Sequence, residues 1–172
     1  MAKRDALSSV FLPVMLFFLA VNTGYSFSEA DLQNLNTTNQ CPGCDLSGMV
    51  LSTAKLQNAN LVKANLSSAS ISNSNLTNAN LTGANMAYIN LNSANMAGAH
   101  LTGADMRVAV LTNAKLQNVN FTDANLSGAA LWDANLTGAN LTGTNLTGAF
   151  LTDAVWIDGM KCKEGSVGEC KK

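Results

Sequence analysis

Residues 79–83 and residues 139–143 both read Ala-Asn-Leu-Thr-Gly, and variants of this five-residue unit fill most of the chain. A large apolar residue returns at every fifth position from residue 46 to residue 156, which gives 23 consecutive positions without an insertion. The residue two places before each of them is Ala in 17 of the 23 units. A period of five matches neither the 3.6 residues of a helix nor the two of a flat strand. The pattern instead predicts a coil that turns a corner every five residues.

Four such units close a square of about 20 residues, and the apolar positions decide which side chains point into it. Residues two apart share one face of extended backbone, so the large residue and the small residue before it both point inward. A small residue is needed because four bulky pairs would overfill one layer of the interior. The chain from residue 46 to residue 156 then makes about 5.5 coils, and a strand spacing of about 4.8 Å gives a rod about 26 Å long.

The repeated unit resembles that of the pentapeptide-repeat family, in which Ala is followed by Asp or Asn, then Leu, then two variable residues. The match extends over residues 44–158. The resemblance implies an all-β fold, a right-handed quadrilateral β-helix, in a non-enzymatic bacterial protein. It also offers one specialised role, since some family members resemble DNA in shape and charge and bind type II topoisomerases. Departures from Ala at the inward position are local and leave the fold prediction intact; they are Met49, Ser74, Ile89, Val119 and Thr144.

Charge restricts the class of partner. The chain has 172 residues, a formal charge of -1 and only 12% charged residues, which argues against binding to nucleic acid or to anionic lipid. Residues 44–158 contain six Asp against four Lys and Arg residues, a net charge of -2, too weak for a mimic of DNA. We therefore expect a protein partner, self-association included, and neither a nucleic acid, a cofactor nor a metal ion.

The N-terminus has the layout of a secretory signal peptide over residues 1–28. Lys3 and Arg4 precede an uncharged apolar run at residues 10–21, and small polar residues follow it. The run is shorter than the roughly 20 residues that span a bilayer comfortably. The sequence thus predicts export to the periplasm or the extracellular space, with no further membrane segment. The alternative is an uncleaved segment that tethers the protein to the membrane.

Both ends of the rod need a cover, because open strand edges pair with other molecules. Residues 29–43 are predicted to cap the first coil, with a short helix over about residues 29–36. This helix would begin at a capping box on Ser28, with Asp31 where Glu or Gln is usual. Residues 159–172 are predicted to form a tail, and Trp156 with Ile157 to plug the last coil.

Four cysteines lie in two pairs at opposite ends of the rod, which argues against a single zinc site made of all four. In an exported chain, Cys162 and Cys170 are predicted to form a disulfide that fixes the tail. Cys41 and Cys44 form a C-x-x-C motif, with Cys44 on an inward position of the first coil. We interpret this pair as a cap disulfide or as buried thiols. Thiol–disulfide exchange through Cys41 and Cys44 is the alternative function.

The repeat frame also predicts which outward side chains lie together. His100, the single histidine, falls on an outward position without a predicted Cys or Ser partner, which indicates a surface residue rather than a catalytic base. Apolar residues concentrate on one side of the rod and its corners, and such a concentration is typical of a contact surface. The candidate interface comprises Val50, Tyr88, Val108, Val110, Phe150 and Trp132. The sequence therefore favours a non-enzymatic, exported structural or protein-interaction module.

Overall fold

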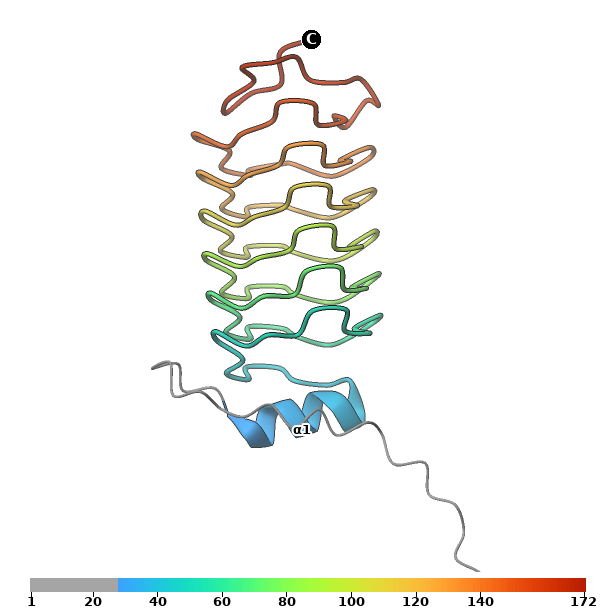
Figure 1. Ribbon diagram of the computed structural model, residues 1–172, viewed down its shortest axis with the longest axis vertical. Coiled ribbons are helices and arrows are strands. Elements are labelled where there is room, and N and C mark those ends of the chain that lie inside the picture. Colours follow the sequence, from blue (N-terminus) through green and yellow to red (C-terminus); the bar gives the residue numbers. More distant parts are fainter. Residues whose placement is uncertain (1–27) are drawn as a thin grey trace, which may run out of the picture.

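The computed structural model describes residues 28–172, so the predicted signal peptide lies outside the described residues apart from Ser28. Within this range the helix α1 (Glu29–Thr38) crosses one end of a rod of stacked coils (Figure 1). The coils contain no continuous strand in residues 28–172, and each contacts the next through isolated parallel β-bridges. No helix in the described part of the chain has the length and apolar character needed to cross a membrane.

Each bridge joins residues 20 positions apart, as between Asn80 and His100 and between His100 and Asn120. Four five-residue units therefore complete one turn, and the bridged residue marks the middle of each side. The first side centres on residues 45, 65, 85, 105, 125 and 145, the second on 50 to 150, the third on 55 to 155 and the fourth on 40 to 140, each in steps of 20.

The corners explain the last residue of the repeated unit. At each corner the carbonyl of the large residue accepts a hydrogen bond from the N–H three residues later, as from Ala84 to Leu81 (3.0 Å). The residue that precedes the N–H donor has left-handed backbone; in this example it is Gly83, with a φ of 65°. Gly and Asn tolerate this conformation best. At Gly143 a Cβ atom would lie 2.1 Å from Oδ1 of Asp123, so a larger residue there would require the Asp123 side chain to move.

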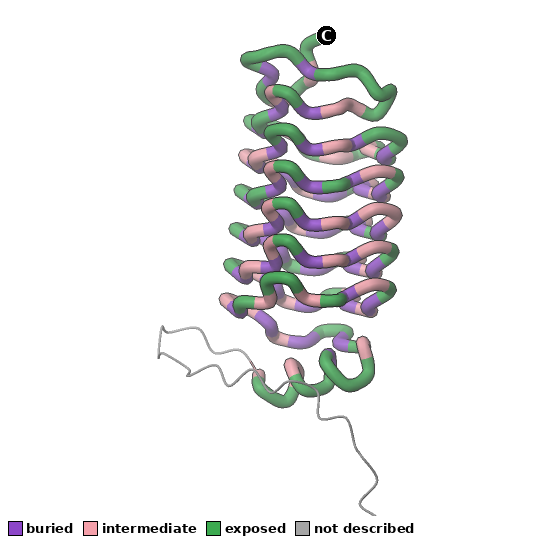
Figure 2. The backbone as a smooth tube through the Cα atoms, turned by 45° about the vertical axis from the view of Figure 1, so that its right-hand side comes forward, coloured by how far each residue is buried: buried purple, intermediate pink, exposed green. Residues whose placement is uncertain are grey.

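The large residues are buried, and buried positions follow one another from coil to coil along the rod (Figure 2). Leu81, Leu101 and Phe121 follow one another on successive coils, and all three are fully buried. Inward polar residues bond to the backbone of the preceding coil. The hydroxyl of Ser74 donates to the Leu51 carbonyl (2.8 Å), and that of Thr144 donates to the Phe121 carbonyl (2.8 Å). These departures from Ala therefore leave no hydroxyl without a partner inside the rod.

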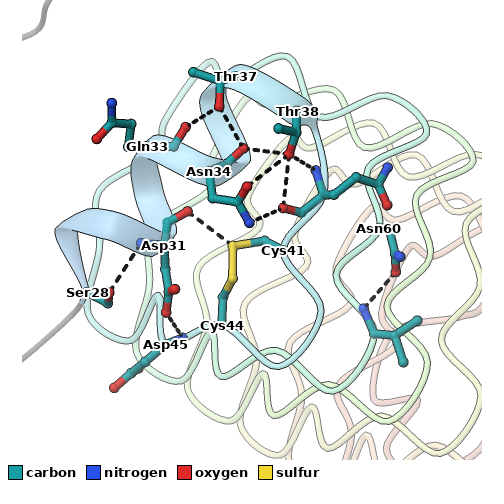
Figure 3. Close-up of a disulfide and its surroundings, with 12 residues drawn as sticks. Ser28, Asp31, Gln33, Asn34, Thr37, Thr38, Cys41, Cys44, Asp45 and Asn60 are labelled. Carbon is teal, nitrogen blue, oxygen red and sulfur yellow. Dashed lines mark hydrogen bonds between the residues drawn. A yellow bond between two sulfur atoms is a disulfide. The ribbon is translucent and has the colours of Figure 1, made fainter.

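At the N-terminal end, helix α1 is two residues longer than the predicted span of 29–36. It continues to Thr38 because Asn39 adopts left-handed backbone and its N–H donates to the Leu35 carbonyl. The capping box is only half formed. Ser28 accepts a hydrogen bond from the Asp31 N–H (3.2 Å), but the Asp31 carboxylate accepts one from the Asp45 N–H (2.9 Å) instead of returning to Ser28 (Figure 3). Asp31 thereby joins the helix to the first coil.

At the C-terminal end, the tail closes part of the last coil by backbone pairing. The prediction that Trp156 and Ile157 plug the coil was wrong for Ile157, which is 40% exposed, whereas Trp156 is half-buried and packs against the core. Two antiparallel bridges cover the edge instead, from Phe150 to Val167 and from Val155 to Lys161. Backbone donors and acceptors at the edge need partners that an indole or an alkyl side chain lacks.

Candidate functional site

The six residues of the candidate interface all lie on the surface. We call Val50, Tyr88, Val108, Val110, Trp132 and Phe150 the apolar face. Their side chains are between 39% and 64% exposed. Large apolar residues rarely gather on a monomer surface without a contact partner.

Four of these six residues lie in the C-terminal half of the rod, and two of the four, Val110 and Phe150, lie on the second side. Val110 bridges to Ala130, and Ala130 bridges to Phe150, which makes an apolar column over three coils. The ring of Trp132 lies across the next corner, with its centroid 5.2 Å from that of Phe150. Tilted aromatic pairs at this distance are a favourable arrangement.

Val50 does not join this group. Ser70 and Asn90 occupy the two positions between Val50 and Val110 on the second side. The contiguous part of the apolar face therefore begins near Tyr88 and extends toward the C-terminus.

The tail adds a residue that sequence reasoning missed. Val167 pairs with Phe150 and is 48% exposed, so it extends the column past the last coil. The five-residue frame ends before the tail, so no periodic signal in the sequence could have placed Val167 there.

Tyr88 and Val108 occupy the corner between the first and second sides, with φ of 61° and 56°. Other coils place Gly48, Gly128 or Gly148 at this corner. Left-handed backbone costs an L-residue roughly 1–2 kcal/mol, and β-branched side chains tolerate it poorly. Among the described residues, Val108 and Thr53 are the β-branched residues with positive φ. An apolar side chain kept at such a position is a reason to look for a function.

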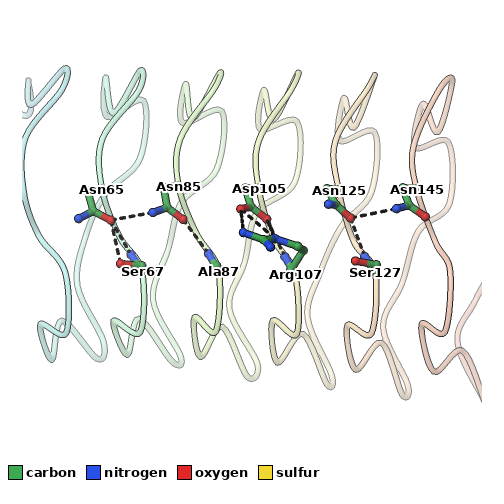
Figure 4. Close-up of polar contacts among 9 residues, drawn as sticks. All are labelled: Asn65, Ser67, Asn85, Ala87, Asp105, Arg107, Asn125, Ser127 and Asn145. Carbon is green, nitrogen blue, oxygen red and sulfur yellow. Dashed lines mark hydrogen bonds and ion pairs between the residues drawn. The ribbon is translucent and has the colours of Figure 1, made fainter.

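The neighbouring first side is polar and carries ladders of Asn side chains (Figure 4). Asn85 donates from Nδ2 to Oδ1 of Asn65 (3.2 Å), and Asn145 does the same to Asn125 (3.3 Å). Asp105 interrupts the ladder, because a carboxylate has no N–H to donate. Arg107 pairs with it, with Nη2 2.7 Å from Oδ2, and this bond holds the pKa of the Asp105 carboxyl below its ordinary value. The charge beside the apolar face is thus paired.

The remaining candidates for chemistry are arranged as structural elements. The structure joins Cys162 to Cys170 by the predicted disulfide, and it also joins Cys41 to Cys44, for which the sequence left a disulfide and buried thiols open. Cys41 is fully buried and Cys44 is 6% exposed. His100 is exposed at the middle of the fourth side. In residues 28–172, no three His, Cys, Asp or Glu side chains come together in a group that could hold a metal ion.

Known sequences place the repeat in one family. The sequence profile that describes pentapeptide repeats matches eight copies, over residues 41–73, 59–96, 89–128 and 120–155. These ranges together cover more than half of the chain. A search of curated proteins finds no match.

Solved structures of pentapeptide repeat proteins resemble the chain. Rfr23 from the cyanobacterium Cyanothece 51142 has 29% identity and a TM-score of 0.52, with 74% of this chain and 97% of Rfr23 covered. For a trypsin-treated form of QnrB1, a plasmid-mediated fluoroquinolone resistance protein, the identity is 25% and the TM-score 0.52, with 64% and 59% covered.

A third similar structure is HetL, a protein involved in heterocyst differentiation regulation in the cyanobacterium Nostoc. It has 31% identity and a TM-score of 0.45, with 71% of this chain and 65% of HetL covered. The chain thus spans less than two thirds of HetL and of QnrB1. Pentapeptide repeat proteins are structural or interaction modules with a right-handed β-helix fold. The unbroken repeat, its 20-residue register and the profile match together show that this chain belongs to the pentapeptide-repeat family.

Proposed function

We propose that the protein is an exported, non-enzymatic module that binds a partner protein through the apolar face. The observation that carries this proposal is the contiguous group of exposed side chains formed by Val110, Trp132 and Phe150 with the corner residues Tyr88 and Val108. Elsewhere the sides carry mainly Asn, Ser and Thr. The apolar face is therefore the part of the described surface that gains most from leaving water.

The composition of this region suits protein recognition. Tyr, Trp and Arg dominate the energetics of protein interfaces, and Tyr88, Trp132 and Arg107 lie on or beside the apolar face. Because Arg107 is already paired with Asp105, the region presents little net charge. A partner surface that is largely apolar at its centre, with polar groups at its rim, would match it.

Burial of the first cysteine pair argues against thiol–disulfide exchange. Exchange requires a thiolate to approach a sulfur atom of the disulfide. Cys41 has no exposed surface, and its Sγ lies 3.2 Å from the Asp31 carbonyl oxygen beneath helix α1 (Figure 3). The position of the disulfide supports a role in holding the cap on the first coil.

Paired charges argue against mimicry of DNA. Asp105 is paired with Arg107, Asp153 with Lys161 and Asp158 with Lys172. Half of the six Asp residues in the repeat region are therefore neutralised by a neighbour. A mimic of DNA needs a regular series of free negative charges along its surface.

A charge-insertion experiment tests the apolar face. We expect Val110→Asp combined with Phe150→Asp to reduce partner binding at least tenfold, because each carboxylate would have to be desolvated in the contact. The measurement is quantitative recovery of bound proteins by mass spectrometry from extracts of the native compartment, with sedimentation velocity to detect self-association.

Asn95→Asp combined with Asn135→Asp is the matched control. It adds the same charge at the same two-coil spacing on the third side, where each carboxylate can still accept the hydrogen bond that the Asn Oδ1 accepts now. If both double variants keep every partner and the association state of the wild type, the apolar face is not the binding site.

Export has its own test. Both disulfides support maturation in an oxidising compartment. We expect fractionation of the native cell to place the protein outside the cytoplasm, and sequencing of the mature N-terminus to begin after Ser26 or Ser28. An N-terminus at Met1 in a membrane fraction would indicate a tether, and a cytoplasmic protein with free thiols would contradict export.

A further inference from the structure

The two ends of the rod are each covered over only half of the square. At the N-terminal end, helix α1 begins beside the first side, where the Ser28 N–H donates to the Asp45 carbonyl (3.1 Å). It ends beside the fourth side, where the Asn39 side chain donates to the Gln57 carbonyl (2.8 Å). Helix α1 does not pass beneath the second and third sides of the first coil. We call this stretch, residues 49–55, the first-coil edge.

The backbone of the first-coil edge lacks hydrogen-bond partners among the described residues. The N–H groups of Val50 and Lys55 have none, and neither have the carbonyl groups of Val50, Ser52 and Lys55. One coil further on, the equivalent groups are paired. The Ser70 N–H donates to the Met49 carbonyl (2.7 Å), and the Asn75 N–H donates to the Ala54 carbonyl (3.0 Å). With respect to residues 28–172, the edge therefore presents unpaired donors and acceptors of the kind found on the edge strand of a sheet.

The inward side chains of this edge are less buried than those of later coils. Leu51 and Ala54 are only half-buried, whereas Ile71 and Ala94 at equivalent positions are fully buried. A groove of about 1080 Å³ separates them from the helix. Its apolar lining comes from Leu32, Leu35, Met49, Leu51, Ala54 and Leu56.

The opposite end of the molecule shows how such an edge is covered. There the second and third sides pair with the protein's own tail, through the antiparallel bridges from Phe150 to Val167 and from Val155 to Lys161. The Leu151 N–H donates to the Ser166 carbonyl (2.9 Å) within this pairing. The tail turns at Glu164 and Gly165, so one short stretch of it completes each of the two sides.

We propose that the first-coil edge binds an extended segment of a partner polypeptide, which adds one strand beneath its second side, at Val50, by β-augmentation. This site is separate from the contiguous part of the apolar face, which Val50 does not join, and does not depend on it. Because the edge turns a corner at Ser52 and Thr53, an extended segment would exchange backbone hydrogen bonds with Val50 on the second side. Its side chains would alternate, so that apolar ones enter the groove toward Leu32 and Leu51.

The position of helix α1 prevents the end of a second copy of the protein from pairing with the first-coil edge. Helix α1, about 10 Å across, stands beneath the first coil, whereas paired strands must approach to about 4.8 Å. A broad end of another molecule would meet the helix before its strands reached the first-coil edge. A lone extended segment is narrow enough to lie beside the helix.

The test uses processed protein and a defined probe. The probe is an acetylated heptapeptide amide, Lys-Val-Thr-Val-Thr-Val-Lys, whose alternating side chains match the groove. We expect saturable changes in the amide NMR signals of Val50, Lys55 and the residues that line the groove. The same peptide with alternate backbone nitrogens methylated should bind at least about tenfold more weakly, because it lacks donors toward the edge.

Protein variants locate the site. Val50→Pro removes an N–H that has no partner within the rod, so we expect a wild-type circular dichroism spectrum and at least about tenfold weaker binding. The variant with Val110→Asp and Phe150→Asp should bind the peptide as the wild type does. A result in which that variant alone loses the peptide would assign binding to the apolar face.

Three outcomes would overturn the proposal. They are the absence of a saturable change up to about 1 mM peptide, equal binding of the methylated peptide, and slow hydrogen exchange of the Val50 and Lys55 amides before peptide is added. The last would mean that these amides are already paired in the processed protein. The methylated peptide and the exchange measurement decide the matter even if Val50→Pro fails to fold.

Discussion

Leu101→Asp abolishes the folded rod. Leu101 is fully buried in the middle of the solenoid, between Leu81 on one adjacent coil and Phe121 on the other. The substitution removes the buried leucine side chain and places a carboxylate where no partner or water reaches it. We expect a loss of more than about 5 kcal/mol, comparable with the whole stability of a typical domain. Circular dichroism should show the β-sheet signal lost at 25 °C.

A neighbouring substitution serves as the control for this result. His100→Asp introduces the same carboxylate one residue away, on an exposed outward position of the same coil. We expect its spectrum and denaturation midpoint to stay close to those of the wild type, since Asp105 shows that this slot accepts a carboxylate. If Leu101→Asp melts with the wild-type midpoint, the assignment of inward and outward positions is wrong.

Removal of the Cys162–Cys170 disulfide has the second largest expected effect. Both residues lie in the tail, so replacing them by Ser opens a loop within the tail and loosens the segment that pairs with the last coil. A closed loop of this length contributes roughly 2–3 kcal/mol in the chain-entropy description. The released tail would also expose the edge that it now covers. We expect a lower midpoint in urea and faster hydrogen exchange at the Leu151 and Asp153 amides, which donate to the tail.

Glu164→Ser combined with Glu169→Ser is the matched control, because both side chains are exposed in the same tail. It should leave the midpoint and the exchange rates nearly unchanged. If the Cys162→Ser and Cys170→Ser protein also kept its midpoint and its slow exchange at Leu151, the backbone pairing alone would hold the tail and the disulfide would be dispensable.

The sequence by itself determined everything that repeats every five residues. The period assigned Leu101 to the interior, Val110 and Phe150 to one outward column, and Cys44 to the inward face of the first coil, and the structure has each of them there. These assignments follow from local backbone geometry, since every unit has the same shape and the register between coils is set by their length. Because all 23 units have the same length, the sequence alone decides which residues point inward and which residues stack on one another.

Only the tertiary structure decided what happens where the repeat stops. The sequence did not indicate that Asp31 would bond to the first coil, that the tail would pair antiparallel and bring Val167 beside Phe150, or that residues 49–55 would be left uncovered. These contacts join non-repeating segments to distant parts of the chain, so the five-residue repeat gives no information about them. Backbone groups at the ends take whichever partner the cap and the tail bring within reach, and only the folded chain fixes that choice.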